Sequence, residues 1–107
     1  MSAQRDILSI EADIVTTLKD VYDPEIPVNI YDLGLIYEVD TEEDGKVTIK
    51  MTLTAPNCPM ADQILQEIND RVGDIDGVTD VAINLTFDPP WEKGMMSEEA
   101  MLELGFL

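Results

Sequence analysis

The chain of 107 residues has no histidine and only one cysteine, Cys58. Without histidine it cannot supply a Ser-His-Asp or Cys-His catalytic group, or a zinc site with histidine ligands. A single cysteine excludes a disulfide within the chain, a cysteine-rich zinc site and a four-thiolate metal cluster held by one copy. Any metal site must therefore combine Cys58 with carboxylates, with a second subunit or with ligands from a partner.

Basic residues are scarce as well. Six lysines and arginines face 23 aspartates and glutamates, which gives a net charge of −17 at pH 7. This charge repels the phosphates of nucleic acids and of anionic membrane surfaces, so neither is an expected partner. It favours a partner with a basic face, or a cation. Because the charge is spread along the chain, part of its role is solubility.

Long apolar runs are also missing. No stretch approaches the ~20 apolar residues that a membrane-spanning helix needs. Residues 1–6 do not show the basic and then apolar pattern of a secretory signal. We therefore expect a cytoplasmic protein with no membrane partner. The length is typical of one domain, with a core over about 7–88 and a C-terminal arm over about 89–107.

The hydrophobic pattern predicts an α+β fold in two layers. A helix is expected over 6–21, with an apolar face made of Ile7, Ile10, Ile14, Leu18 and Val21 and widened by Leu8 and Val15. Strands are expected over 35–39 and 47–53, joined by a hairpin whose turn is Asp44-Gly45. A second helix over 59–73, with Gly73 as candidate C-cap, leads to a strand over 78–87. The last two strands should be parallel, which gives a three-stranded mixed sheet.

Cys58 lies where the second strand gives way to the second helix. Pro59 suits the first helical position, so Cys58 is expected at or beside the N-cap. The positive end of the helix dipole would stabilise a thiolate there, whereas the carboxylate of Asp62 would oppose it. A small buried cysteine without chemistry explains the same pattern equally well.

Asp23 and Glu25 flank Pro24 in the loop after the first helix. A fixed pair of carboxylates could bind a cation or orient a thiol. Because aspartate before proline commonly begins a turn, the spacing alone favours a structural role.

The C-terminal arm carries a large apolar surface, from Trp91, Met95, Met96, Met101 and Phe106. Ser97 followed by two glutamates predicts the N-cap of a short helix over 97–104. The arm is expected to fold back on the body of the protein. The alternative is that it presents a docking surface to a partner.

Four motifs stand in order along this chain: Asp23-Pro-Glu-Ile-Pro27, Asp32-Leu-Gly34, Leu53-Thr-Ala-Pro-Asn-Cys-Pro59 and Asp88-Pro-Pro-Trp91. Together they resemble the small iron–sulfur assembly domain family, over roughly residue 7 to the C-terminus. That family includes SufT-like and PaaD-like proteins, eukaryotic cytosolic cluster-targeting subunits and the N-terminal domain of Mrp-type ATPases. The arm with its Ser-Glu-Glu helix is most similar to the SufT-like branch.

The resemblance implies an auxiliary factor that serves iron–sulfur cluster assembly or transfer and is not a catalyst. The family's cysteine corresponds to Cys58, its acidic loop to Asp23 and Glu25, and its strand-end threonine to Thr54. Asp32 and Asp62 match family positions with supporting roles. The cofactor implied is a transient iron–sulfur cluster or iron, held by Cys58 together with a second subunit or partner.

The partners implied are iron–sulfur scaffold or carrier proteins, apo-client proteins and a second copy of the chain. Two other hypotheses stay open at this point. A non-catalytic adaptor would recruit clients through its acidic surface and the Trp91 arm, with Cys58 structural. An enzyme would use Cys58 as a nucleophile activated by the helix end, without histidine.

Overall fold

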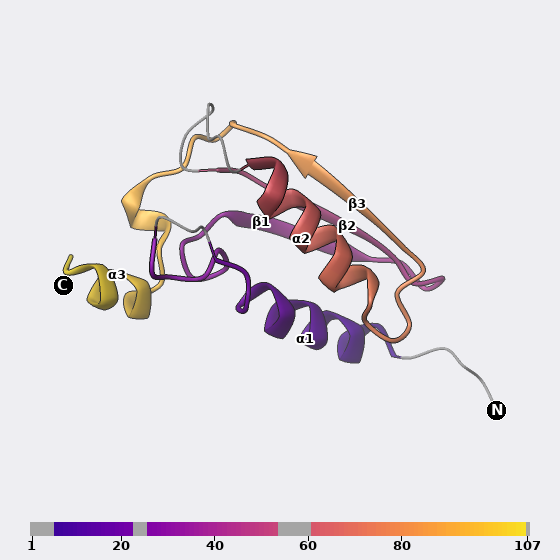
Figure 1. Cartoon of the computed structure of the whole chain (residues 1–107). Helices are drawn as coiled ribbons and strands as arrows, with labels where there is room; N and C mark the ends of the chain where they lie inside the picture. The colour runs from indigo at the N-terminus through magenta and orange to yellow at the C-terminus, as the bar shows by residue number, and fades with distance from the viewer. Residues whose placement is uncertain (1–5, 23–25, 54–60, 107) are drawn as a thin grey trace.

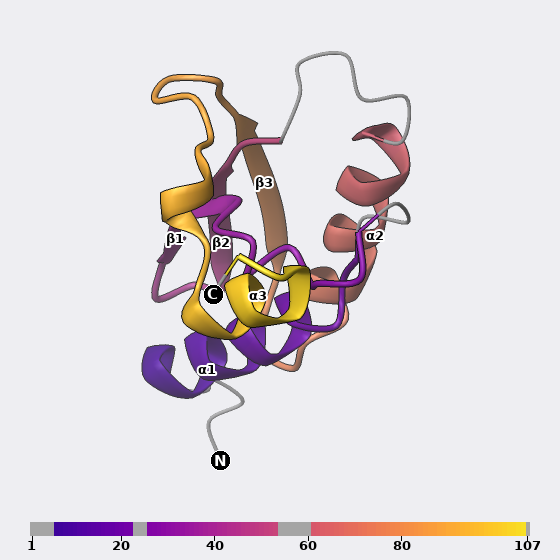
Figure 2. The ribbon, with the colours of Figure 1, turned by 90° about the vertical axis from the view of Figure 1, so that its left-hand side faces the viewer.

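Two helices lie on one face of a three-stranded mixed sheet in the computed structural model of the chain, which describes residues 6–22, 26–53 and 61–106 (Figures 1 and 2). The two-layer α+β fold predicted from the hydrophobic pattern is therefore confirmed. Its elements in chain order are α1 (Ile7–Leu18), β1 (Ile36–Thr41), β2 (Lys46–Met51), α2 (Ala61–Gly73), β3 (Asp80–Leu85), a 3-10 turn (Lys93–Met95) and α3 (Glu98–Leu104).

The sheet has the order β1-β2-β3, with β2 in the centre. β1 and β2 are antiparallel, and the hairpin between them turns at Gly45, whose φ of +91° suits glycine. β2 and β3 are parallel, and Val47, Ile49 and Met51 pair with Val81, Ile83 and Leu85. Both the antiparallel hairpin and the parallel pair are as the sequence predicted.

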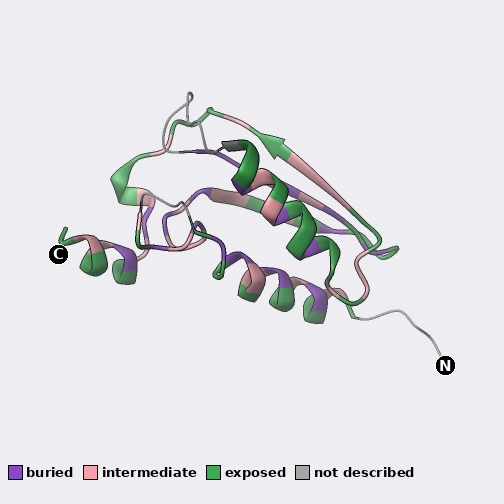
Figure 3. Cartoon of the chain, in the orientation of Figure 1, coloured by how far each residue is buried: buried purple, intermediate pink, exposed green. Residues whose placement is uncertain are grey.

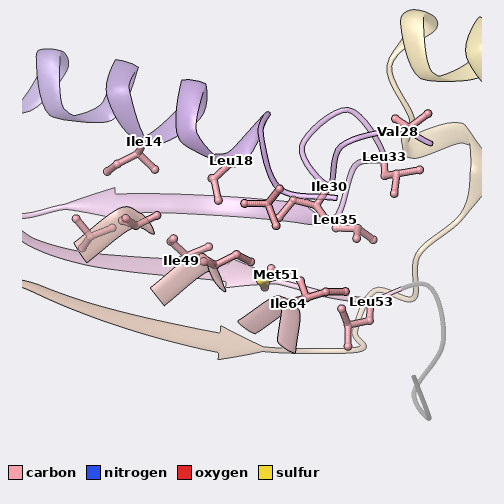
Figure 4. Close-up of a cluster of buried hydrophobic side chains, with 14 of the residues drawn as sticks. Ile14, Leu18, Val28, Ile30, Leu33, Leu35, Ile49, Met51, Leu53 and Ile64 are labelled. Atoms are coloured by element: carbon pink, nitrogen blue, oxygen red, sulfur yellow. The ribbon is translucent and has the colours of Figure 1, made fainter. Parts of the chain in front are cut away.

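The core lies between the sheet and the two helices (Figures 3 and 4). Alternate residues of β2 point into it, as expected for a strand with one buried face. The helices contribute residues at spacings of three and four, which gives each helix one apolar stripe. The buried residues of these three elements are Ile10, Ile14, Leu18, Val47, Ile49, Met51, Ile64, Ile68 and Val72.

Two expectations for α1 are wrong. Leu8 does not widen the apolar face, because its side chain is 72% exposed. In a helix with 3.6 residues per turn, a residue two positions from the buried Ile10 lies on the opposite side of the helix. The helix also ends at Leu18 and not at residue 21. Val21 is nevertheless fully buried, because its carbonyl accepts a hydrogen bond from the Ile30 N–H at 2.8 Å and draws the loop onto the core.

The third strand is shorter than predicted and less covered. It spans 80–85 and not 78–87, and Leu85 and Phe87 are 40% and 39% exposed. Edge strands lose cover because they have a neighbour on one side only. Gly73 is the last residue of α2 and has no left-handed φ, so it does not serve as the expected C-cap. Gly77 takes that conformation instead, with φ of +95°.

The C-terminal arm folds back on the body, as expected. The indole N–H of Trp91 donates to the Leu33 carbonyl at 2.6 Å, and the Ser97 N–H donates to the Asp32 carbonyl at 2.8 Å. Met96 is buried in the core. Ser97 caps α3 as predicted, because its hydroxyl oxygen accepts a hydrogen bond from the Ala100 N–H at 3.1 Å.

Gly34 gives a test of the contact between the arm and the turn before β1. Its φ is +84°, and an added Cβ would press on the carbonyl oxygen of Met95. We expect Gly34→Ala to lower the free energy of unfolding by more than about 2 kcal/mol, from left-handed backbone strain together with the clash. Urea titration followed by the fluorescence of Trp91, the only tryptophan, measures this change.

Gly94→Ala is the matched control, because Gly94 has no left-handed φ and an added Cβ there meets nothing within 4 Å. It should stay within about 0.5 kcal/mol of the wild type. Equal stabilities of the two variants would contradict the close contact between Gly34 and the arm.

Candidate functional site

Three segments meet at the end of the sheet where β2 stops. The Thr86 N–H, just after β3, donates to the Met51 carbonyl at 2.8 Å. The Thr52 N–H donates to the carbonyl of Leu35, just before β1, also at 2.8 Å. Thr52 and Leu53, which follow β2, are buried. The chain is therefore packed against the core up to the residue before segment 54–60.

The loop after α1 is pinned at the same end. The Leu35 N–H donates to the Ile30 carbonyl at 3.2 Å, and the Ile30 N–H donates to the Val21 carbonyl at 2.8 Å. Tyr22 and Asn29 form an isolated antiparallel bridge, which brings together the chain on both sides of residues 23–25. Figure 4 shows the side chains of this region gathered at one end of the core, namely Val28, Ile30, Leu33, Leu35 and Leu53.

The four principal site residues predicted from the sequence lie outside the described residues: Cys58, Thr54, Asp23 and Glu25. Their roles stay predictions. The structure does place the described residues before segment 54–60 and on both sides of 23–25, and these belong to one hydrogen-bonded framework at one end of the sheet. This is the arrangement that a site shared by the two segments requires.

Asp32 lies in that framework and is already engaged. Its N–H donates to Asn29 Oδ1 at 2.8 Å, and Asn29 Nδ2 donates to Asp32 Oδ2 at 2.9 Å. The two side chains thus close a turn, a common use of asparagine and aspartate. The spacing of asparagine and aspartate three residues apart could have revealed this role in the sequence. Asp62 lies in the first turn of α2 and is exposed, where a carboxylate favours the helix.

A cavity of about 250 Å³ adjoins this turn. It lies between the loop after α1 and helix α3, and its lining residues are Tyr22, Pro27, Val28, Asn29, Asp32, Glu99, Ala100 and Glu103. Glu99 and Glu103 reach the same cavity because residues four apart share a helix face. Neither was predicted as a site residue: Glu99 was assigned only to the first turn of the helix, and no role was predicted for Glu103.

The cavity is acidic, but it is not a complete metal site. Over 6–22, 26–53 and 61–106, no three side chains of the histidine, cysteine, aspartate or glutamate type are close enough together to hold a metal ion. A bound metal would therefore need ligands from the other residues of the chain or from another molecule.

Comparison with known proteins agrees with the sequence motifs. Residues 11–85 match the model of the family described as iron-sulfur cluster assembly protein. The chain is 63% identical to a Fe-S protein maturation auxiliary factor of Porphyromonas gingivalis, over 95% of this chain and 97% of that protein. It is 40% identical to the Fe-S protein maturation auxiliary factor SufT of Staphylococcus aureus, over 79% and 97% of the two chains.

A solved structure supports the fold. The crystal structure of a domain of unknown function, DUF59, from Bacillus anthracis has a TM-score of 0.86 with this chain. The two sequences are 35% identical, and the match covers 94% of this chain and 95% of the other. The three-stranded sheet with its two covering helices is therefore an arrangement that related sequences adopt.

The Asn29–Asp32 pair yields a prediction about stability. Asp32→Ala should lower the free energy of unfolding by about 1 kcal/mol, because it removes the hydrogen bond between the two side chains, and Asn29→Ala should lower it by more, because it also removes the acceptor of the Asp32 N–H. The double variant should cost about as much as Asn29→Ala alone, because the hydrogen bond between the two side chains can be lost only once. Urea titration of the three variants measures this coupling.

Asp62→Ala is the control carboxylate, and it should leave the Asn29–Asp32 coupling unchanged. If the effects of Asn29→Ala and Asp32→Ala simply add, the two side chains act independently and the assigned hydrogen bond between them is wrong.

Proposed function

The chain belongs to the iron-sulfur cluster assembly protein family, and on that premise we propose that it is an auxiliary factor in the assembly of iron–sulfur clusters or their transfer to apo-proteins. The observation that carries this proposal is the 63% identity to a maturation auxiliary factor over almost the whole of both chains. In this proposal the protein carries or hands over a cluster and does not catalyse a reaction.

In this proposal Cys58 is the iron or cluster ligand, or the thiol that contacts the client. Asp23, Glu25 and Thr54 line the site around it, with Asp32 and Asp62 in support. The hydrogen-bonded framework at the end of β2 supports this grouping, because it joins the end of β2, just before segment 54–60, to the residues on both sides of 23–25.

The cluster is cargo, and one thiolate is too few to hold it. Iron–sulfur clusters usually take four protein ligands. With one cysteine in the chain, the proposal therefore includes shared ligation, by a second copy or by a scaffold, carrier or apo-client protein. A transient, shared site suits a factor that must release what it binds.

The surroundings of the protein are part of the proposal. Its charge of −17 favours protein partners with basic surfaces and disfavours nucleic acids and anionic membranes. Among the described residues, no helix is both long enough and apolar enough to cross a bilayer. We place the protein in the cytoplasm, as one domain with its core over about 7–88 and its arm over about 89–107.

A second candidate function is the adaptor. The arm exposes two large apolar side chains, Leu102 at 62% and Phe106 at 48%, which could contact a client. Trp91 is less suited to that contact than its sequence motif indicates, because its indole N–H is already bonded to the Leu33 carbonyl and the residue is half-buried. An adaptor would recruit clients through α3 and the acidic surface, with Cys58 structural.

Reconstitution with iron and sulfide under anaerobic conditions tests the first function. We expect the wild type to bind iron and acid-labile sulfide and to gain visible absorption, whereas Cys58→Ser gains neither, because the only thiolate ligand is lost. Native mass spectrometry should find the cluster in a dimer, or in a complex with an apo-client protein.

The control variant keeps one thiol in the chain but places it at another position. Cys58→Ser combined with Ser9→Cys, which places a cysteine at an exposed position of α1, should bind no cluster. A stable cluster in strictly monomeric wild type would overturn shared ligation. Equal cluster content in all three proteins would overturn the role of Cys58.

The adaptor makes a different prediction. If it is the function, Leu102→Glu combined with Phe106→Glu should abolish maturation of an apo-client protein, while Cys58→Ser leaves maturation intact. These exposed substitutions spare the buried Met96 and Ala100, which a deletion of the arm would remove from the core. Loss of maturation in Cys58→Ser, with normal maturation in the double variant, would contradict the adaptor.

A further inference from the structure

The two edges of the sheet are built differently. β1 carries the charged side chains of Glu38 and Asp40, and its pairing with β2 is interrupted by a bulge between residues 36 and 38. Tyr37 also donates a hydrogen bond to the Pro89 carbonyl of the arm at 2.8 Å. Charges, bulges and covering segments are the devices by which proteins prevent an edge strand from pairing with another chain.

β3 forms the other edge, and beyond its first residue, Asp80, it carries no charged side chain and has no bulge in its pairing with β2. Residues 81–87 contain no charged residue and no proline, in a chain with a net charge of −17. Within the part of the chain that the structure describes, β3 pairs only with β2. Figure 1 shows its outer edge open, and Figure 2 shows α2 lying on the face of the sheet.

The backbone groups along this edge follow from the register. The Thr86 N–H points to β2, where it reaches the Met51 carbonyl. Successive residues of a strand direct their N–H and C=O groups to opposite edges. The backbone N–H and C=O groups of Val81, Ile83 and Leu85 therefore point away from β2, towards the free edge. There they form a row of donors and acceptors with which a further strand can pair.

The apolar face beside this edge is also open. Val81, Ile83 and Leu85 pair with fully buried residues of β2, yet they are only partly covered, and Leu85 is exposed. Phe87, two residues further on, is exposed too. A strand added here would cover this surface with alternate side chains while its backbone paired with β3.

We propose that the free edge of β3 is a docking site for an extended polypeptide segment of a partner protein, apolar in the middle and with lysine or arginine at its ends. The charges favour this occupant. Asp80 and Asp88 stand at the two ends of the uncharged stretch, and both are exposed. Basic residues in matching positions of the partner would be attracted to them.

The same charges disfavour a second copy of this chain. Antiparallel pairing of two β3 strands about their common centre at Asn84 would set Asp80 of each copy opposite Asp88 of the other. Like charges directly opposite each other destabilise a strand pair. The proposal does not depend on cluster binding.

The test uses the full-length protein and a synthetic peptide of alternating threonine and valine with two lysines at each end. Fluorescence anisotropy measures binding, and amide hydrogen exchange by NMR locates it. We expect bound peptide to slow exchange at Val81, Ile83 and Leu85 by at least about tenfold. The N–H of Asn84, which faces β2, should be unaffected.

Two control peptides separate pairing from charge attraction. One replaces the lysines with glutamates, and the other keeps the lysines but replaces the central valine with proline. Both should bind at least about tenfold more weakly, the first through repulsion and the second because proline cannot complete the ladder. Equal binding of the proline peptide would overturn strand pairing.

Leu85→Pro removes one edge N–H and leaves the charge unchanged. It should weaken peptide binding by about three- to tenfold, the effect of one backbone hydrogen bond, whereas Leu85→Val should bind as the wild type does. If Leu85→Pro does not fold, Leu85→Lys replaces it, because a cation there repels the peptide's lysines and should weaken binding at least as much.

Two results would overturn the proposal. One is peptide-induced protection confined to other elements, with the β3 edge unchanged. The other is concentration-dependent dimerisation in sedimentation with protection of Val81, Ile83 and Leu85 in the absence of peptide, which would make a second copy the occupant.

Discussion

The turn Asp32-Leu33-Gly34 is the constraint on which the functional end of this molecule depends. Each of its three residues contacts the C-terminal arm. The Asp32 carbonyl accepts a hydrogen bond from the Ser97 N–H, and the Leu33 carbonyl accepts one from the Trp91 indole. Gly34 packs against the Met95 carbonyl. Only glycine permits that approach at a positive φ. Residues distant in sequence are thus fixed by backbone groups, whose positions are set by the core.

This turn also connects the arm to the candidate site. Asp32 is held by Asn29, and Asn29 belongs to the bridge that closes the loop around residues 23–25. Helix α3, placed by the same turn, brings Glu99 and Glu103 to the acidic cavity. A substitution that weakens the contact between the arm and this turn should therefore also affect the loop after α1, because only a few hydrogen bonds separate the two. The motifs that identify the family are for this reason partly structural.

Local periodicity predicted most of the fold. The buried stripe of α1 and the alternation in β2 follow directly from the spacing of apolar residues. The error for β3 occurs because burial depends on the covering element: Leu85 and Phe87 alternate as predicted but lie at an edge of the sheet. The site was less predictable, because the hydrogen bond from Ser97 to the Asp32 carbonyl and the cavity that Glu103 lines join distant segments. The roles of Cys58, Thr54, Asp23 and Glu25 rest on motifs and stay predictions.

The acidic charge and the single cysteine together constrain how such a protein can work. One cysteine cannot supply the four ligands that an iron–sulfur cluster usually takes, so in the proposed function the remaining ligands come from another molecule. A charge of −17 makes approach to a second copy unfavourable and approach to a basic surface favourable, most strongly at low salt. A partner that supplies both the missing ligands and the opposite charge satisfies the two requirements at once. Hetero-complexes should therefore prevail over homodimers when both are available.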